Sequence, residues 1–215
     1  VYEAKLGAAE LARELGDQRL AERLGREAGQ LRDRFHAAFW CEEIASYALA
    51  LDGSKRQCQV ASSNAGHTLW SGIAAADHAQ RIVDGLMAPQ FFSGWGIRTI
   101  PTGAPRYNPM SYHNGSIWPH DNALIAAGMA RYGRTESAMR LLASTFDASL
   151  HLDAHRLPEL FCGFPRRPGF GPTLYPVACA PQAWAAAAVF GMLQACLVLE
   201  VIGEAPQIVL RAPRL

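Results

Sequence analysis

The stretch that decides the fold is residues 122–132, NALIAAGMARY, followed after two residues by 135–149, TESAMRLLASTFDAS. The first segment is apolar on every side of a helix, which predicts a helix buried all round. The second carries one apolar stripe at helical spacing, made of Ala138, Leu141, Leu142, Thr145 and Phe146. This periodicity predicts an amphipathic helix that covers its buried neighbour.

The same alternation recurs along the chain. Residues 64–75 are small and apolar, whereas 77–87 have one apolar face. Two amphipathic helices are predicted before them, over 3–15 and 20–35, because Gly16-Asp17 interrupts the stripe. A further all-apolar helix is predicted over 181–199. The periodicity fails between residues 40 and 63, where an ordered loop with one short strand near 47–51 is expected.

Helices that alternate between all-apolar and amphipathic indicate two concentric layers. We therefore predict an all-α fold of the (α/α)6 toroid type, with long loops gathered at one end; a plain bundle of amphipathic helices is the weaker interpretation. A closed double ring of this type has twelve helices, and seven are predicted here. The chain is therefore expected to form a single domain, residues 1–215, that corresponds to slightly more than the second half of a toroid.

The composition excludes several classes of protein. Half of the 215 residues are hydrophobic, which excludes a disordered chain. The net charge of +1 provides no electrostatic attraction for nucleic acid or an anionic membrane. Five cysteines without a C-x-x-C pair favour reduced thiols and a cytoplasmic protein. No export segment opens the chain, and no nucleotide-binding motif is present, so we expect neither a membrane span nor a cofactor.

The long loops concentrate Trp, Tyr, His, Asn and Asp but are poor in Lys. An indole face packs on the apolar face of a pyranose, while carboxylates and amides hydrogen-bond its hydroxyl groups. The loops therefore indicate a recognition surface for sugars.

Five runs carry a resemblance to a known family. They are SNAGH (63–67), FSGWGIRT (92–99), YNPMSYHNGSIWPHDNALIA (107–126), LPELFCGFPR (157–166) and YPVACAPQAWAAAA (175–188). In this order they resemble the C-terminal catalytic region of the glycogen-debranching, amylo-α-1,6-glucosidase-like family. The resemblance implies an (α/α)6 toroid and inverting hydrolysis of an α-glucan or oligosaccharide, with α-1,6 linkages favoured.

Inverting hydrolysis needs one carboxylic acid and one carboxylate base. The resemblance implies that Glu159, in the Leu-Pro-Glu-Leu motif, is the base. The loop that supplies the acid in this family would precede Val1, so we expect the acid to lie outside the sequence. Asp121 is the best internal substitute, although its motif suits sugar binding better.

Other residues of these loops are expected to contact substrate. They are His67, Trp95, Arg98, His113, Asn114, Trp118 and His120, together with Glu43 of the Phe-Trp-Cys-Glu-Glu run. Individually, Trp95 and Trp118 could equally fill core, Asp121 could cap a helix and His67 could be a core histidine. His113, His120 and Asp121 could also be read as metal ligands, but their spacing does not favour a metal site.

Two alternatives to a glycosidase stay open at this stage. One is a non-catalytic sugar-binding fragment, and the other is a sugar epimerase in which His113 and His120 would move protons. Because half a ring would expose the flanks of its inner helices, we also expect the chain to associate with itself or with a missing N-terminal half of the barrel.

Overall fold

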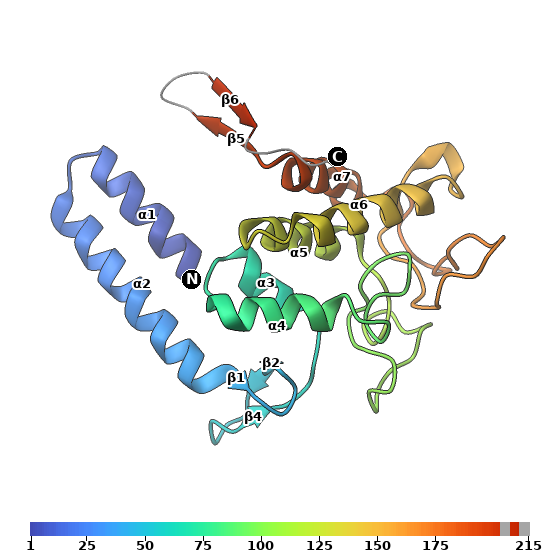
Figure 1. The fold of residues 1–215 in the computed structure, drawn as a ribbon, viewed down its shortest axis with the longest axis horizontal. Coiled ribbons are helices and arrows are strands. Elements are labelled where there is room, and N and C mark those ends of the chain that lie inside the picture. The colour runs from blue at the N-terminus through green and yellow to red at the C-terminus, as the bar shows by residue number, and fades with distance from the viewer. Residues whose placement is uncertain (203–206, 211–215) are drawn as a thin grey trace.

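The computed structural model describes residues 1–202 and 207–210. Within these residues the chain is predominantly helical (Figure 1). The α-helices are α1 (Tyr2–Glu14), α2 (Gln18–Phe39), α3 (Ala65–Trp70), α4 (Ala76–Leu86), α5 (Pro119–Arg131), α6 (Thr135–Ser149) and α7 (Ala183–Leu197), with one 3-10 turn, η1 (Asp153–His155). The described part of the chain thus contains the seven α-helices that the periodicity predicts.

Three small antiparallel ribbons accompany the helices. They pair β1 (Trp40–Cys41) with β2 (Ser46–Tyr47), β3 (Ala50–Leu51) with β4 (Gln57–Cys58), and β5 (Leu199–Ile202) with β6 (Gln207–Leu210). The segment predicted as a loop with one strand therefore holds two short ribbons. Asp52 closes the turn between β3 and β4, because its carboxylate accepts hydrogen bonds from the backbone of Ser54 and Arg56.

Helix α5 forms the centre of the fold and packs against α3, α6 and α7. Its crossing with α3 is close because of Gly128, where a Cβ atom would lie 2.5 Å from the backbone nitrogen of Trp70. Ile125, Ala126 and Met129 are fully buried on the same helix. The prediction of an inner helix covered by α6 is confirmed for this pair. Phe146 of the predicted apolar stripe is 60% exposed, however, and Leu124, Ala127 and Ala130 leave one side of α5 partly exposed.

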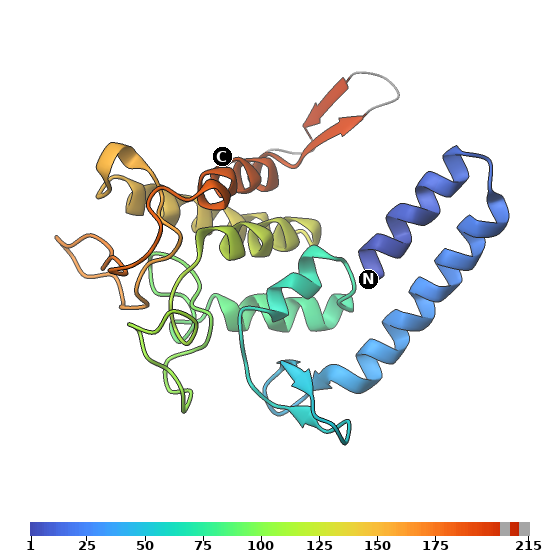
Figure 2. The ribbon, with the colours of Figure 1, turned by 180° about the vertical axis from the view of Figure 1, so that it is seen from behind.

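The α1–α2 hairpin projects from one side of the molecule, and the long loops 88–118 and 150–182 gather at the opposite side (Figures 1 and 2). The break between the two helices lies where the sequence places it. Gly16 adopts a positive φ of 78°, and Oδ1 of Asp17 accepts a hydrogen bond from the Leu20 backbone, which caps α2.

The loops are tied to the helical core by a short series of backbone bridges. Ile117 pairs with both Arg98 and Phe161, and Phe161 pairs with Leu174. The Asn122 side chain reaches from α5 to accept a hydrogen bond from the backbone of Ile97 at 2.7 Å and to donate one to its carbonyl at 3.1 Å. Because these bonds are buried, the loops have a fixed position at the N-terminal end of α5.

Two helices differ from the prediction. Helix α3 ends at Trp70 instead of continuing to residue 75, and Gly72 follows with a φ of 69°. Helix α7 begins at Ala183 and is buried on one side only: Trp184 is 47% exposed and Phe190 is 73% exposed. The all-apolar composition of 181–199 predicted burial all round, which is wrong for this chain, because the exposed flank of α7 has no neighbouring helix among the described residues.

The described residues contain no helix that is both long and apolar enough to cross a bilayer.

Candidate active site

Glu159 lies in the loop between η1 and α7, at the loop-bearing side of the molecule. Its side chain is buried, and the residue is only 7% exposed. Oε1 accepts a 2.6 Å hydrogen bond from the hydroxyl of Tyr112, and Oε2 accepts a longer one, 3.4 Å, from the backbone of Cys179. The backbone N–H of Glu159 donates in turn to the carbonyl of Cys179 at 2.9 Å. Two loops distant in the sequence thus hold the carboxylate in one orientation.

The hydrogen bond to Glu159 changes the acidity of Tyr112. It raises the pKa of the phenol to about 12, because ionisation would place a second negative charge beside the carboxylate. The phenol therefore stays protonated at neutral pH and acts as a fixed donor. A carboxylate oriented by a neutral donor retains free lone pairs, so it can accept a proton from water.

Aromatic rings surround this carboxylate. Tyr112 lies edge-on to Trp118 and Tyr175, with ring centroids 4.9 and 5.5 Å apart. The His113 ring stacks parallel to Trp118 at 5.8 Å, and Nε1 of Trp118 donates to the Ser116 hydroxyl. Trp118 is 8% exposed, so it forms the buried base of the group.

His113 and Asn114 lie beyond these rings and are both exposed. The main chain of Asn114 fixes the loop, since its N–H donates to the Ser111 hydroxyl and its carbonyl accepts from Asn108. Their side chains are therefore free to face a ligand.

A second polar group, formed by His67, His120 and Asp121, lies at the N-terminal end of α5. Nε2 of His67 and Oδ1 of Asp121 are 2.6 Å apart, although the residues belong to α3 and α5. The His120 ring adjoins Trp118 at 5.6 Å and Trp184 at 5.0 Å. Trp118 thus joins this group to the surroundings of Glu159, and the two predicted carboxylates share one end of the molecule.

Two atoms of this polar group are buried without a partner among the described residues: Oδ2 of Asp121 and Nδ1 of His120. Burial lowers the pKa of His120, which favours the neutral imidazole. Buried polar atoms without hydrogen bonds cost free energy, and they are common at sites that bind water or ligands.

Trp95 and Arg98 have packing roles in this chain, which differs from the expectation that they contact substrate. Trp95 is 3% exposed, lies in a core cluster with Ile117 and Phe161, and has the Arg166 guanidinium 4.5 Å above its ring. Arg98 is 2% exposed, and its guanidinium donates to four backbone carbonyls, those of Pro89, Gln90, Phe91 and Gly163. Neither side chain has a free surface that a sugar could reach.

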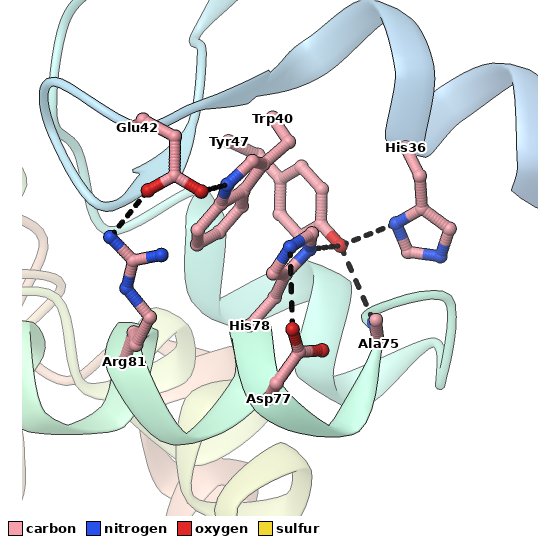
Figure 3. Close-up of polar contacts among 8 residues, drawn as sticks. All are labelled: His36, Trp40, Glu42, Tyr47, Ala75, Asp77, His78 and Arg81. Atoms are coloured by element: carbon pink, nitrogen blue, oxygen red, sulfur yellow. Dashed lines mark hydrogen bonds and ion pairs between the residues drawn. The ribbon is translucent and has the colours of Figure 1, made fainter.

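Glu43 lies in the turn between β1 and β2. Its Oε2 accepts a hydrogen bond from the thiol of Cys41, which lowers the pKa of the Glu43 carboxyl. The neighbouring Glu42 bridges Arg81 of α4 and the indole of Trp40, and these bonds lower its pKa to about 2 (Figure 3). No contact among the described residues connects Glu43 with Glu159 or Asp121.

An open apolar groove of about 890 Å³ lies between α5 and α7 and begins at His120 and Trp184. Its lining includes larger side chains such as Glu3, Trp70 and Arg131 and the small residues Ala123, Ala127, Ala130, Ala187, Ala188, Gly191 and Ala195. The exposed flank predicted for an incomplete ring is thus present.

The sequence patterns do not indicate roles for Tyr112, Tyr175 and Trp184. Tyr112 immediately precedes His113 in the motif 107–126, but no pattern in the sequence indicates that its hydroxyl reaches a carboxylate 47 positions later. In the part of the chain that the structure describes, His113, His120 and Asp121 do not form a three-ligand metal group.

Comparison with known families places these residues in context. Residues 1–162 match the family described as mannosylglycerate hydrolase MGH1-like glycoside hydrolase domain. This match includes Glu159 and most of the loops at the candidate site. None of the curated proteins matches the chain.

Solved structures share the fold. An uncharacterized conserved protein from Thermus thermophilus superposes with a TM-score of 0.70 and 19% identity, over 88% of this chain and 44% of that one. A GH63 mannosylglycerate hydrolase from the same organism, in complex with glucose, gives 0.69 and 18%, over 89% and 42%. Neutral trehalase from Saccharomyces cerevisiae gives 0.68 and 16%, over 90% and 36%.

The fold is therefore part of an (α/α)6 toroid, as the alternation of helices predicted. The chain spans less than half the length of these structures. The match to glycosidases supports the coarser part of the family resemblance, whereas a specifically glycogen-debranching enzyme stays a prediction.

Proposed function

Because this chain belongs to the MGH1-like glycoside hydrolase family, we propose that it provides the general-base side of an inverting glycosidase site, with Glu159 as the base. The observation that carries the proposal is the position of this carboxylate. It is buried and held by Tyr112 and by the backbone of Cys179, within a group of aromatic rings that suits a sugar.

In the proposed reaction, Glu159 removes a proton from a water molecule as that water attacks the anomeric carbon. The acid that protonates the leaving oxygen approaches from the other face, with the two carboxyl groups roughly 6.5–9.5 Å apart. Tyr112 stays protonated and holds Glu159 in place. Trp118 is the buried base on which the His113 ring stacks, and the exposed His113 and Asn114 are placed to hydrogen-bond hydroxyl groups.

Asp121 is better suited to sugar recognition than to the role of acid. One of its oxygens already lies 2.6 Å from His67 Nε2, and the residue is 8% exposed. We propose that the acid belongs to the part of the toroid that this chain does not contain, since the structural relatives are about twice as long.

For the substrate, we propose an α-linked glucoside. The resemblance of the loop motifs to debranching enzymes supports an α-1,6 linkage in a glucan, whereas the family match favours a small glycoside instead. A non-catalytic sugar-binding fragment is the second candidate, and the absence of an assigned acid favours it.

Because the proposed acid lies outside this chain, the test uses α-glucosyl fluoride, whose leaving group needs no protonation, as the substrate of the 215-residue chain. Isomaltose, limit dextrin, trehalose and mannosylglycerate serve as binding ligands, and the variants are wild type, Glu159→Gln and the exposed control Glu10→Gln. We expect turnover to fall by about 10²–10⁴-fold in Glu159→Gln alone, with product of inverted anomeric configuration detected by proton NMR. Sugar binding without turnover in any variant would support the second candidate. Turnover that survives Glu159→Gln, or product of retained configuration, would overturn the assignment.

A further inference from the structure

Tyr47 occupies a junction between α2, β2 and α4, away from the candidate active site. The residue is 3% exposed. Its hydroxyl oxygen lies 2.7 Å from Nδ1 of His36 and 3.1 Å from Nδ1 of His78, and it accepts a 3.4 Å hydrogen bond from the backbone N–H of Ala75 (Figure 3). Two imidazoles and one phenol thus share a single oxygen.

The donors and acceptors around the Tyr47 oxygen limit the number of protons that this junction can hold. A phenol donates one hydrogen bond and accepts through its lone pairs. Ala75 already uses one acceptor position, so the O–H group must point to one of the two imidazoles, and that nitrogen must be unprotonated. If both Nδ1 atoms carried protons, the phenol oxygen would face three N–H donors, those of Ala75, His36 and His78. Its own O–H group would then have no acceptor.

The two distances indicate which imidazole is the acceptor. A separation of 2.7 Å is typical of a hydroxyl donor, whereas 3.1 Å is typical of an N–H donor. We therefore assign the phenol as donor to Nδ1 of His36, and Nδ1–H of His78 as donor to the phenol. The neutral His36 then carries its proton on Nε2, and the neutral His78 carries its proton on Nδ1.

Protonation has opposite consequences for the two rings. His78 would take its additional proton on Nε2, which lies 3.8 Å from a carboxylate oxygen of Asp77, and would keep its bond to Tyr47. The ring also stacks on the indole of Trp40, with centroids 3.5 Å apart and an angle of 2°. The nearby Glu42 is paired with Arg81 at 2.7 Å, and the Arg81 guanidinium lies 5.0 Å from the Trp40 ring centroid.

His36 would have to take its additional proton on Nδ1, where the Tyr47 O–H already points. The charged groups around it are Arg32 and Asp33 on α2 and His78 and Asp77 on α4. Burial, followed by His78 and Arg32, lowers the pKa of His36, and the two aspartates oppose this. A proton on His36 therefore costs its hydrogen bond to Tyr47.

This junction attaches the C-terminal end of the α1–α2 hairpin to the rest of the fold. Phe35 and Phe39 of α2 stack on each other, and Phe35 packs on the Tyr47 ring at 4.7 Å. At the other end of the hairpin, Glu3 pairs with Arg131 at 3.4 Å, at an exposed position. Exposed ion pairs contribute little stability. Among the described residues, the Tyr47 junction is one of three polar attachments at the C-terminal end of the hairpin, beside the hydrogen bonds from Gln57 to the Ala38 carbonyl and from the Ala48 N–H to the Phe39 carbonyl.

We propose that Tyr47, His36 and His78 form a proton-operated latch between α2 and α4. It opens when a proton binds Nδ1 of His36, where the Tyr47 hydroxyl points. Opening loosens the C-terminal end of α2 from α4 while the bundle around α5 stays folded.

The first test is NMR of the ring nitrogens of the full chain, from about pH 7.5 to about pH 5, across the range in which histidine titrates. We expect the Nε2–H tautomer for His36 and the Nδ1–H tautomer for His78, and titration of His36 below the ordinary histidine range, because burial lowers its pKa. The reverse tautomers, or titration of His36 at or above the ordinary range, would overturn the proposal.

The second test is hydrogen exchange across the same range, corrected for the intrinsic effect of pH on exchange. Protection of the C-terminal half of α2 should fall by about tenfold for each unit that separates the His36 pKa values of the open and closed states, while α5 stays protected. His36→Gln should remove this pH dependence, and Tyr47→Phe should weaken it, because His36 stays buried in that variant. His78→Gln and the control His155→Gln should retain it. Equal loss of protection in α2 and α5, or wild-type protection of α2 that does not depend on pH, would contradict the latch.

Discussion

The hydroxyl of Tyr112 donates a 2.6 Å hydrogen bond to Oε1 of Glu159, although 47 residues separate the two in the chain. This bond connects the aromatic loop before α5 with the loop before α7. It gives the proposed base a fixed orientation, and it raises the pKa of the phenol to about 12.

Replacing Glu159 with Gln should lower the pKa of Tyr112 from about 12 toward its ordinary value of 10, because the amide removes the negative charge that opposes ionisation. Carbon-13 labelling of the tyrosine ring would resolve the titration by NMR. Glu10→Gln, an exposed change on α1, should leave the Tyr112 curve in place. An unchanged curve in Glu159→Gln would show that the bond does not persist in solution.

Gly163→Ala should destabilise the fold by about 3 kcal/mol or more. A Cβ atom at this position would lie 1.7 Å from the carbonyl oxygen of Gly115, so the two loops would have to separate. Gly7→Ala is the matched control: the helical site in α1 has open space, and the change should add about 0.5–1 kcal/mol. Urea unfolding of both variants measures the difference, and equal midpoints would refute the close approach.

Arg98→Met should lower stability by about 2–4 kcal/mol, because buried carbonyls lose their donor. If Arg98 instead contacts substrate, the variant would keep its unfolding midpoint and lose sugar affinity. Thermal unfolding and calorimetric titration with isomaltose separate these results. Arg106→Met, at an exposed loop position, should change the free energy of unfolding by no more than about 0.5 kcal/mol.

Stability should fall as the pH drops below about 6.5. The folded-state pKa values of His36 and His120 are lowered, chiefly by burial, so the unfolded chain binds protons first. Their stabilising contribution is therefore complete above the unfolded pKa and is lost as the pH falls toward the folded values. His36→Gln and His120→Gln should each flatten the dependence of the urea midpoint on pH, and a slope that both variants retain would assign it to other groups.

The groove between α5 and α7 should cause association of the isolated chain. Trp184 lines it and is 47% exposed. Trp184→Ser should shift the sedimentation profile toward monomer, because it removes apolar surface from the contact. The matched control is Phe146→Ser, which changes an exposed aromatic residue of α6 outside the groove lining. A wild-type monomer at all concentrations would contradict the prediction.

Periodicity in the sequence was sufficient to predict the helical elements, because burial of an apolar stripe depends on local spacing. It identified α5 and α6 as an inner and an outer helix and placed the break between α1 and α2 at Gly16. It overestimated the length of α3 and the burial of α7, because composition shows only that a surface is apolar. Whether a neighbour covers that surface depends on the rest of the fold.

The motifs also identified the loops that form the candidate site, and Glu159 and Asp121 within them. The individual roles needed the tertiary structure. The sequence does not show whether Arg98 binds a sugar or four backbone carbonyls. Only its buried position distinguishes these two roles. The single domain predicted for residues 1–215 stays a prediction, and residues 203–206 and 211–215 lie outside the described part of the chain.

By itself, the sequence determined the order of helices and loops and the chemical character of each loop, because these follow from residue type and spacing along the chain. Only the tertiary structure decided that Tyr112 contacts Glu159, that His67 contacts Asp121 and that two histidines share the hydroxyl of Tyr47. Hydrogen bonds act over about 3 Å, and folding brings residues to that distance irrespective of their separation in the sequence.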